Sequence, residues 1–160
     1  MPMRRQKGLS LIEMLVSLAI VAIIIMAVSP SIQSILIKNR ITSEINEFSA
    51  VIQFARNNAI DQQITTVICP SDDYLACTTN WNDPKIVFID SDNDGDRSAA
   101  EELLATSGAI SGNNVLTGPN SSLFFNPLGE ARANSTLLLC HNSKNAEYAR
   151  SLSINFQGRV

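Results

Sequence analysis

The chain has 160 residues, a mass of 17.4 kDa and a formal net charge of −3, so it has room for one domain with one appended segment. Hydrophobic residues make up 45% of the chain and charged residues 17%, which excludes intrinsic disorder and provides enough apolar side chains for a core. The acidic balance argues against a surface that binds nucleic acid throughout, and one histidine with three cysteines argues against a His-based metal centre.

The N-terminus combines a short basic segment with a long apolar one. Residues 1–8 contain three cations, and 17 of the 20 residues from Leu9 to Val28 are apolar. A helix of this length and composition can cross a bilayer. The positive-inside rule keeps the basic segment in the cytoplasm and sends residues 31–160 to the other side. We therefore expect a single-pass membrane helix with the remainder of the chain outside the cytoplasm.

Glu13 lies four residues into this apolar run. An ionised carboxylate costs about 2.5 to 3.5 kcal/mol at the centre of a membrane helix and less near an interface, so a charge at this position requires a partner. Cleavage between Gly8 and Leu9 would create an α-amino group four residues away, in the same subunit or in a neighbour. We expect this ammonium group to neutralise Glu13 and the pair to set the register of packed helices.

The segment from Lys7 to Glu13, KGLSLIE, followed by an apolar helix, resembles the class III signal of type IV pilins and pseudopilins. The resemblance implies that a prepilin peptidase removes residues 1–8 at the cytoplasmic face and that Leu9, where Phe is usual, is N-methylated. It also implies that Glu13 occupies the family's acidic position. The expected location is the inner membrane, with the globular part in the periplasm, and later a pilus or pseudopilus built with other major and minor pilins.

Beyond Pro30, apolar residues recur at spacings of three and four, which indicates an amphipathic helix. One long helix is predicted from about Ser10 to about Asp61, kinked or loosened at Pro30, where proline removes a backbone donor. Residues 9–29 would form its transmembrane or filament-core part and residues 30–62 its amphipathic part. The predicted apolar stripe consists of Ile32, Ile35, Leu36, Ile41, Ile45, Phe48, Ile52, Ala55 and Ala59.

Residues 63–160 change to short β-rich runs separated by Asn, Asp, Gly, Pro and Ser. This pattern indicates antiparallel meanders that pack against the amphipathic helix. The predicted fold class is therefore α+β, a long N-terminal helix packed on a C-terminal antiparallel β-sheet globule, as in type IV pilins. The predicted strands are Ile64–Cys69, Lys85–Asp90, Leu103–Ser107, Asn113–Leu116, Ser122–Asn126, Thr136–His141 and Ser151–Gln157.

The residues that carry a second resemblance are Ile68–Ser71, Cys77, Trp81, Val87–Asp90, Leu139–Cys140 and Gly158–Arg159. Together they resemble the GspH/FimT/FimU group of minor pilins and pseudopilins, which are rare components at or near the filament tip. The resemblance implies a minor pilin of a type IV pilus that contributes to filament priming, assembly or the tip complex, and so to twitching motility. The alternative on the same plan is a minor pseudopilin of a type II secretion system.

Three cysteines in a segment outside the cytoplasm predict one disulfide bond and one leftover thiol. We favour a bond between Cys69 and Cys77, which would close a short loop. A bond between Cys69 and Cys140 is the alternative and would join two strands. In the favoured pairing, Cys140 follows the apolar run 137–139 and is expected to be buried as a small hydrophobic residue.

The stretch from Asp90 to Glu101 fits the calcium-loop pattern D-x-D-x-D-G-x5-E in every specified position. Carboxylates at alternating positions, with a glycine at the bend, allow oxygens to converge on a hard cation. Residues 85–89 predict a strand rather than the entering helix of an EF-hand, so a solvated acidic turn is the competing interpretation. The candidate Ca²⁺ ligands are Asp90, Asp92, Asp94, Asp96 and Glu101, and no other cofactor is expected.

The sequence offers no paired-carboxylate pocket, no Ser/His/Asp set and no phosphate-binding glycine loop, so we do not expect an enzyme. A DNA-binding minor pilin for natural transformation is a further alternative, because some FimT-like proteins take up DNA through basic residues near the C-terminus. Their motif continues with a second Arg where this chain has Gly158-Arg159-Val160, so DNA is not the favoured partner. The candidate DNA-binding residues are Arg132, Lys144, Arg150 and Arg159.

Overall fold

The structure is a computed structural model that describes residues 10–143 and 145–160, and the side chains of residues 27–30 are outside this description. The chain divides into two units, Met1–Ile37 and Lys38–Val160. In chain order the elements are α1 (Leu11–Gln62), β1 (Thr66–Pro70), β2 (Lys85–Ile89), β3 (Leu103–Ser107), β4 (Asn114–Thr117), β5 (Leu123–Phe125), β6 (Ser135–His141), the 3₁₀ helix η1 (Ala146–Tyr148) and β7 (Ala149–Ile154).

The strands form two antiparallel sheets, with the orders β3-β2-β1-β5 and β4-β6-β7. Each predicted strand is present, with bounds that differ by a few residues. The α+β fold is confirmed, and the expected sheet is divided into two. This division arises because β5 returns to pair with β1, which leaves β4, β6 and β7 to form their own ladder.

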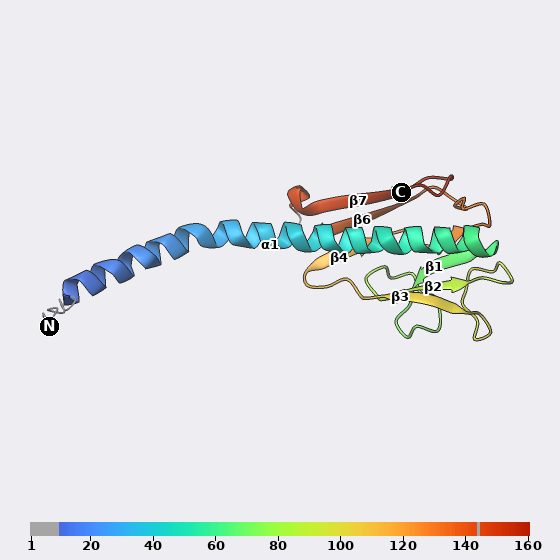
Figure 1. Ribbon diagram of the computed structural model, residues 1–160, viewed down its shortest axis with the longest axis horizontal. Coiled ribbons are helices and arrows are strands. Elements are labelled where there is room, and N and C mark those ends of the chain that lie inside the picture. The colour runs from blue at the N-terminus through green and yellow to red at the C-terminus, as the bar shows by residue number, and fades with distance from the viewer. Residues whose placement is uncertain (1–9, 144) are drawn as a thin grey trace, which may run out of the picture. The chain divides into compact units, whose positions relative to one another are not determined.

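The C-terminal part of α1 packs on the sheets through one face (Figure 1). The buried helix residues are Ile41, Ile45, Phe48, Ile52, Ala55 and Ala59, all at most 8% exposed. They repeat at spacings of three and four, which confirms this part of the predicted stripe. The first three residues of that stripe, Ile32, Ile35 and Leu36, are instead exposed within the unit Met1–Ile37.

Strands β1 and β2 are buried along their whole length because both faces of the first sheet are covered. Side chains alternate between the faces of a strand. On one face, Val67, Cys69, Ile86 and Phe88 form a core cluster, against which Cys77 and Phe124 pack. On the other face, Lys85 approaches the Phe48 ring of α1, with its Nζ 5.9 Å from the ring centroid. The first sheet is thus a middle layer between the helix and the loops of the opposite face.

Cys69 and Cys77 form the favoured disulfide bond, with their Cα atoms 5.5 Å apart. Within the loop that it closes, Asp73 Oδ1 accepts hydrogen bonds from the backbone amides of Leu75 and Ala76, at 2.8 and 3.0 Å. These amides lower the pKa of the Asp73 carboxyl below its ordinary value. The loop is therefore fixed both covalently and by hydrogen bonds to a carboxylate.

The prediction that Cys140 is fully buried is wrong. Cys140 is a free cysteine of intermediate burial. Leu137 and Leu139 of β6 are buried, whereas Leu138 is 42% exposed. Because side chains alternate along a strand, Cys140 lies on the same face as Leu138 rather than on the core face.

Lys85 is the largest fully buried polar residue of the core, at 1% exposed. Burial lowers the pKa of its ammonium group from 10.5 to about 8, and the carboxylates of Glu47, Glu44 and Asp83 oppose this effect. Its Nζ lies 3.5 Å from the carbonyl oxygen of Gly108. The stem of Lys85 fills space under α1, while its charge is stabilised mainly by acidic side chains of the same helix.

Replacing Cys69 and Cys77 with Ser should lower the free energy of unfolding of the globule by about 2 to 3 kcal/mol, because the bond closes a loop of only eight residues. Urea titration of the detergent-solubilised chain, followed by the fluorescence of the single, buried Trp81, measures the loss. Cys140→Ser is the matched control and should change little. An unchanged midpoint in the Cys69/Cys77 double variant would contradict the structural role of the bond.

The stability of the globule should rise with pH between about 8 and 10.5. In this window the unfolded chain still binds the Lys85 proton, whereas the folded chain has released it, so raising the pH favours the folded state. Urea midpoints measured across this range report the effect. In Lys85→Met the part of the rise that is due to this residue should disappear. If the two curves run parallel, Lys85 does not titrate as described.

Candidate functional site

The first candidate site is the apolar N-terminal segment of α1. Its large apolar side chains between Leu11 and Met26 are all more than half exposed. An 18-residue window of α1 near the N-terminus is apolar enough to cross a membrane, and none of it is buried within the chain. Such a surface is stable only in lipid or against other apolar helices.

Glu13 lies on this exposed segment, in the first turn of α1. Its backbone carbonyl accepts a hydrogen bond from Ser17 Oγ at 2.7 Å. Gly8 and Leu9, the residues of the expected cleavage site, lie outside the described residues. Pro30 lies within α1, and its side chain is outside the description.

The second candidate site is the loop that follows β2. Asp90 is fully buried, and its Oδ2 accepts a hydrogen bond from the amide of Gly95 at 3.2 Å. One carboxylate oxygen from each of Asp90, Asp92 and Asp94 lies within 4.8 Å of the others. Burial raises the pKa of the Asp90 carboxyl, and the negative charges of Glu101 and Asp92 raise it further, while the amides of Asn93 and Gly95 lower it.

The other two predicted ligands are placed differently. Asp96 is exposed, and its amide donates to Asp94 Oδ1 at 2.8 Å. Glu101 is 6% exposed, and its two oxygens accept hydrogen bonds from the amides of Ser91 and Ser98, at 2.9 and 2.8 Å. The structure therefore gathers three of the five predicted carboxylates, while Glu101 holds the two ends of the loop together.

Gly95 fixes the bend of the loop against the first sheet. Its φ is +87°, and a Cβ at this position would lie 2.3 Å from the Phe124 ring. Its carbonyl oxygen accepts a hydrogen bond from Ser122 Oγ at 3.1 Å and lies 3.7 Å from the sulfur of Cys77. The Arg132 guanidinium stacks on the same Phe124 ring, 3.6 Å from its centroid. The acidic loop, the disulfide loop and β5 thus meet on one face of the first sheet.

The candidate DNA-binding cations lie on separate parts of the globule. Arg132 shares a cavity with Ile154 at the end of β7, whereas Arg150 lies near the beginning of that strand and donates to the carbonyl of Ala149 at 2.7 Å. Arg159 follows a tight turn, in which its amide donates to Asn155 Oδ1 at 2.9 Å. Lys144 lies outside the described residues. No basic cluster is formed by the three that the structure describes.

Two charged residues of α1 that sequence reasoning did not single out connect the helix to the globule. Glu44 accepts hydrogen bonds from Ser111 Oγ and Asn114 Nδ2, at 2.5 and 2.8 Å. Arg56 Nε donates to the carbonyl of Gly129 at 2.9 Å. Both residues flank the apolar stripe, and this is the signal in the sequence that could have identified them.

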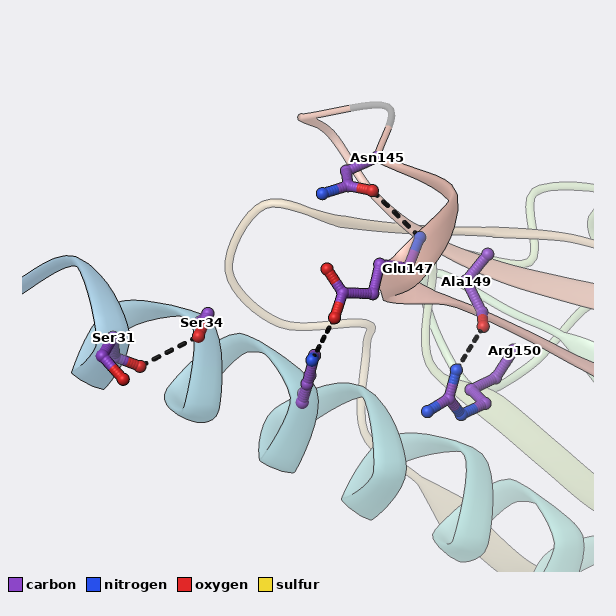
Figure 2. A network of polar contacts seen from close by, with 7 residues as sticks. Ser31, Ser34, Asn145, Glu147, Ala149 and Arg150 are labelled. Carbon is purple, nitrogen blue, oxygen red and sulfur yellow. Dashed lines mark hydrogen bonds and ion pairs between the residues drawn. The ribbon is translucent and has the colours of Figure 1, made fainter.

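A further polar network joins the start of the second unit to η1, as Figure 2 shows. Lys38 forms an ion pair with Glu147, whose amide is held by Asn145 Oδ1 at 3.0 Å. Lys38 Nζ also lies 6.0 Å from the centroid of the Tyr148 ring. Because both charged side chains are partly exposed, this pair orients η1 rather than stabilising the fold strongly.

Comparison with protein families gives two matches. The model described as Type II transport protein GspH matches residues 44–158, and the model described as Prokaryotic N-terminal methylation motif matches residues 3–29. The two models match separate segments of the chain. The first covers the packed part of the helix and the globule, and the second covers the basic and apolar N-terminus. No curated protein sequence matches the chain significantly.

Solved structures share the fold. The type IV minor pilin FimU of Pseudomonas aeruginosa aligns with a TM-score of 0.62 and 20% identity, covering 76% of this chain and 87% of FimU. The minor pseudopilin EpsH from the type II secretion system of Vibrio cholerae aligns with a TM-score of 0.53 and 11% identity, covering 74% of this chain and 91% of EpsH.

Replacing Gly95 with Ala should destabilise the globule by about 1 to 3 kcal/mol, because the left-handed backbone disfavours a Cβ and Phe124 occupies its space. Thermal unfolding monitored by Trp81 fluorescence measures the change. Gly108→Ala is the matched control, since a Cβ at Gly108 meets nothing within 4 Å. Equal melting temperatures for the two variants would refute this account of the bend.

Proposed function

This chain belongs to the GspH family of minor pilins and pseudopilins, and we propose that it is a minor pilin of a type IV pilus that contributes to filament priming, assembly or the tip complex. Its partners would be the N-terminal helices of other major and minor pilins. A minor pseudopilin of a type II secretion system is the alternative, since the matching family model is described as Type II transport protein GspH and the fold is shared with the minor pseudopilin EpsH. The role is structural in both.

The observation that supports this proposal is the exposed apolar segment that carries one carboxylate. The side chains from Leu11 to Met26 are not covered within the described chain, and Ile32, Ile35 and Leu36 are exposed as well. An anchor that only spans a bilayer needs no ionisable group, and Glu13 makes insertion less favourable. A filament of packed helices can offset this cost by placing a cation beside Glu13.

The cation that we propose is the α-ammonium group of Leu9 in a neighbouring subunit. It would arise when a prepilin peptidase cuts after Gly8, and N-methylation would keep its positive charge. The match of residues 3–29 to the methylation motif supports this processing. We further propose that the uncut chain resides in the inner membrane with the globule in the periplasm, and that residues 9–29 form the filament core after assembly.

The fold of this chain is shared with FimU, a type IV minor pilin, and with EpsH, a minor pseudopilin, so the adjoining subunits decide between a pilus and a secretion system. DNA uptake is not proposed, because Arg132, Arg150 and Arg159 are dispersed over the globule and the net charge of the chain is −3.

Glu13→Gln should strongly reduce the amount of this subunit in sheared filaments while leaving its processing intact, because the substitution removes the charge that attracts the neighbour's ammonium group. Immunoblotting of sheared filaments and of membranes gives the ratio, and mass spectrometry of the membrane form reports loss of residues 1–8 and one added methyl group. Glu102→Gln, an exposed carboxylate of the globule, is the matched control and should assemble normally.

Two results would contradict the proposal. An uncut leader in the native chain would leave an ordinary membrane anchor. Undiminished incorporation of the Glu13→Gln subunit would show that the carboxylate plays no part in assembly. Independently of these results, identifying the subunits that adjoin this chain in purified filaments would distinguish a type IV pilus from a type II secretion system.

A further inference from the structure

We propose that the loop from Asp90 to Glu101 binds one Ca²⁺ ion through the carboxylates of Asp90, Asp92 and Asp94. This site is independent of filament assembly through the N-terminal helix. It lies on the face of the first sheet that α1 does not cover, next to the Cys69–Cys77 disulfide. Two separate observations support it.

The first observation is the convergence of three carboxylates. One oxygen from each lies within 4.8 Å of the other two. Two oxygens bound to one Ca²⁺ ion, each at about 2.4 Å, are at most about 4.8 Å apart, so the three oxygens lie close enough together to share one ion. Like charges at this separation repel one another, and a divalent cation between them converts the repulsion into attraction.

The second observation concerns Asp90 alone. Its side chain is fully buried, and its Oδ1 has no hydrogen-bond partner among the described residues. A buried acceptor without a partner costs free energy, and a buried carboxylate costs more. The Oδ2 atom is held by the Gly95 amide, which keeps the carboxylate at the start of the loop beside Asp92 and Asp94. A bound cation would give the Asp90 carboxylate the partner that its Oδ1 atom lacks.

The chemistry of the donors selects the ion. All three are carboxylate oxygens, which suit hard cations, and the nearby sulfur of Cys77 is held in a disulfide bond, which excludes it as a thiolate ligand. Mg²⁺ requires distances of about 2.0 to 2.1 Å in a nearly ideal octahedron and usually keeps several of its waters. Ca²⁺ accepts irregular sets of six to eight oxygens, so water and backbone carbonyls can complete its shell.

Glu101 prepares the loop for the ion without belonging to the group of three. By accepting hydrogen bonds from the Ser91 and Ser98 amides, it draws the end of the loop back to its beginning. Gly95 at the bend packs on Phe124 of β5. A cation bound in the loop would therefore reinforce its contacts with Phe124 of β5 and with the disulfide loop, and we expect it to raise the thermal stability of the globule.

The test uses the full chain, solubilised in detergent and stripped of metal with a chelator. Calorimetric titration with CaCl₂ should give one ion per chain, with a dissociation constant of about 10⁻⁴ to 10⁻³ M, the range of extracellular modules. The melting temperature followed by Trp81 fluorescence should rise with the Ca²⁺ concentration, because the ion binds the folded state. MgCl₂ should bind more weakly and shift the melting temperature less.

Asp92→Asn and Asp94→Asn should each weaken Ca²⁺ binding by about tenfold or more, since affinity follows the number of charged ligands. Both residues are exposed, so the variants should keep the fold, which circular dichroism without metal verifies. Asp72→Asn, an exposed carboxylate of the disulfide loop, is the matched control and should bind as the unchanged chain does.

The proposal is overturned if no heat appears up to about 10 mM CaCl₂, well above the expected constant. It is also overturned if Asp72→Asn weakens binding as much as Asp92→Asn does, or if Mg²⁺ acts as strongly as Ca²⁺, because either result would indicate general charge screening. Each outcome is independent of whether the subunit enters a filament.

Discussion

The structure depends on the burial of one helix face against the first sheet. Strands β1 and β2 carry apolar side chains on both faces, so they are stable only as a middle layer. The stripe from Ile41 to Ala59 supplies one cover, and the disulfide loop with Phe124 supplies the other. Lys85 illustrates this constraint. Its position in β2 faces α1, so even this charged side chain is buried, and carboxylates of the helix stabilise its charge.

Much of this architecture could be predicted from the sequence because it depends on the spacing of apolar and turn residues within short segments. The spacing of the helix stripe from Ile41 onward, the positions of the strands and the Cys69–Cys77 pairing all follow from patterns within short segments. The pairing of β5 with β1 could not be predicted in this way, because it joins segments about 57 residues apart and depends on which edge of the sheet remains free. The partial burial of Cys140 follows from the register of β6, and the apolar run before it does not show which of its residues face the core.

The candidate sites were likewise predictable from the sequence only in part. Glu13 and the acidic loop are recognisable from residue type and spacing alone. Spacing did not show that Asp90, Asp92 and Asp94 converge whereas Glu101 accepts hydrogen bonds from backbone amides. This difference depends on how the loop bends over Phe124. The dispersal of Arg132, Arg150 and Arg159 is likewise a property of strand placement, since nearness in sequence to the C-terminus does not bring cations to one surface.

The environment of Arg56 has a consequence for the order of folding events. Its guanidinium group donates to the carbonyls of Gly129 and Gln157, which are 73 and 101 residues away along the chain. Next to it, a Cβ at Gly158 would lie only 2.0 Å from the oxygen of Gly129, so the two backbones touch. Contacts of such long sequence separation must overcome a large loop-closure entropy before they contribute. The hydrogen bonds of Arg56 to Gly129 and Gln157 can therefore form only once the last turn of the globule has folded back onto the helix.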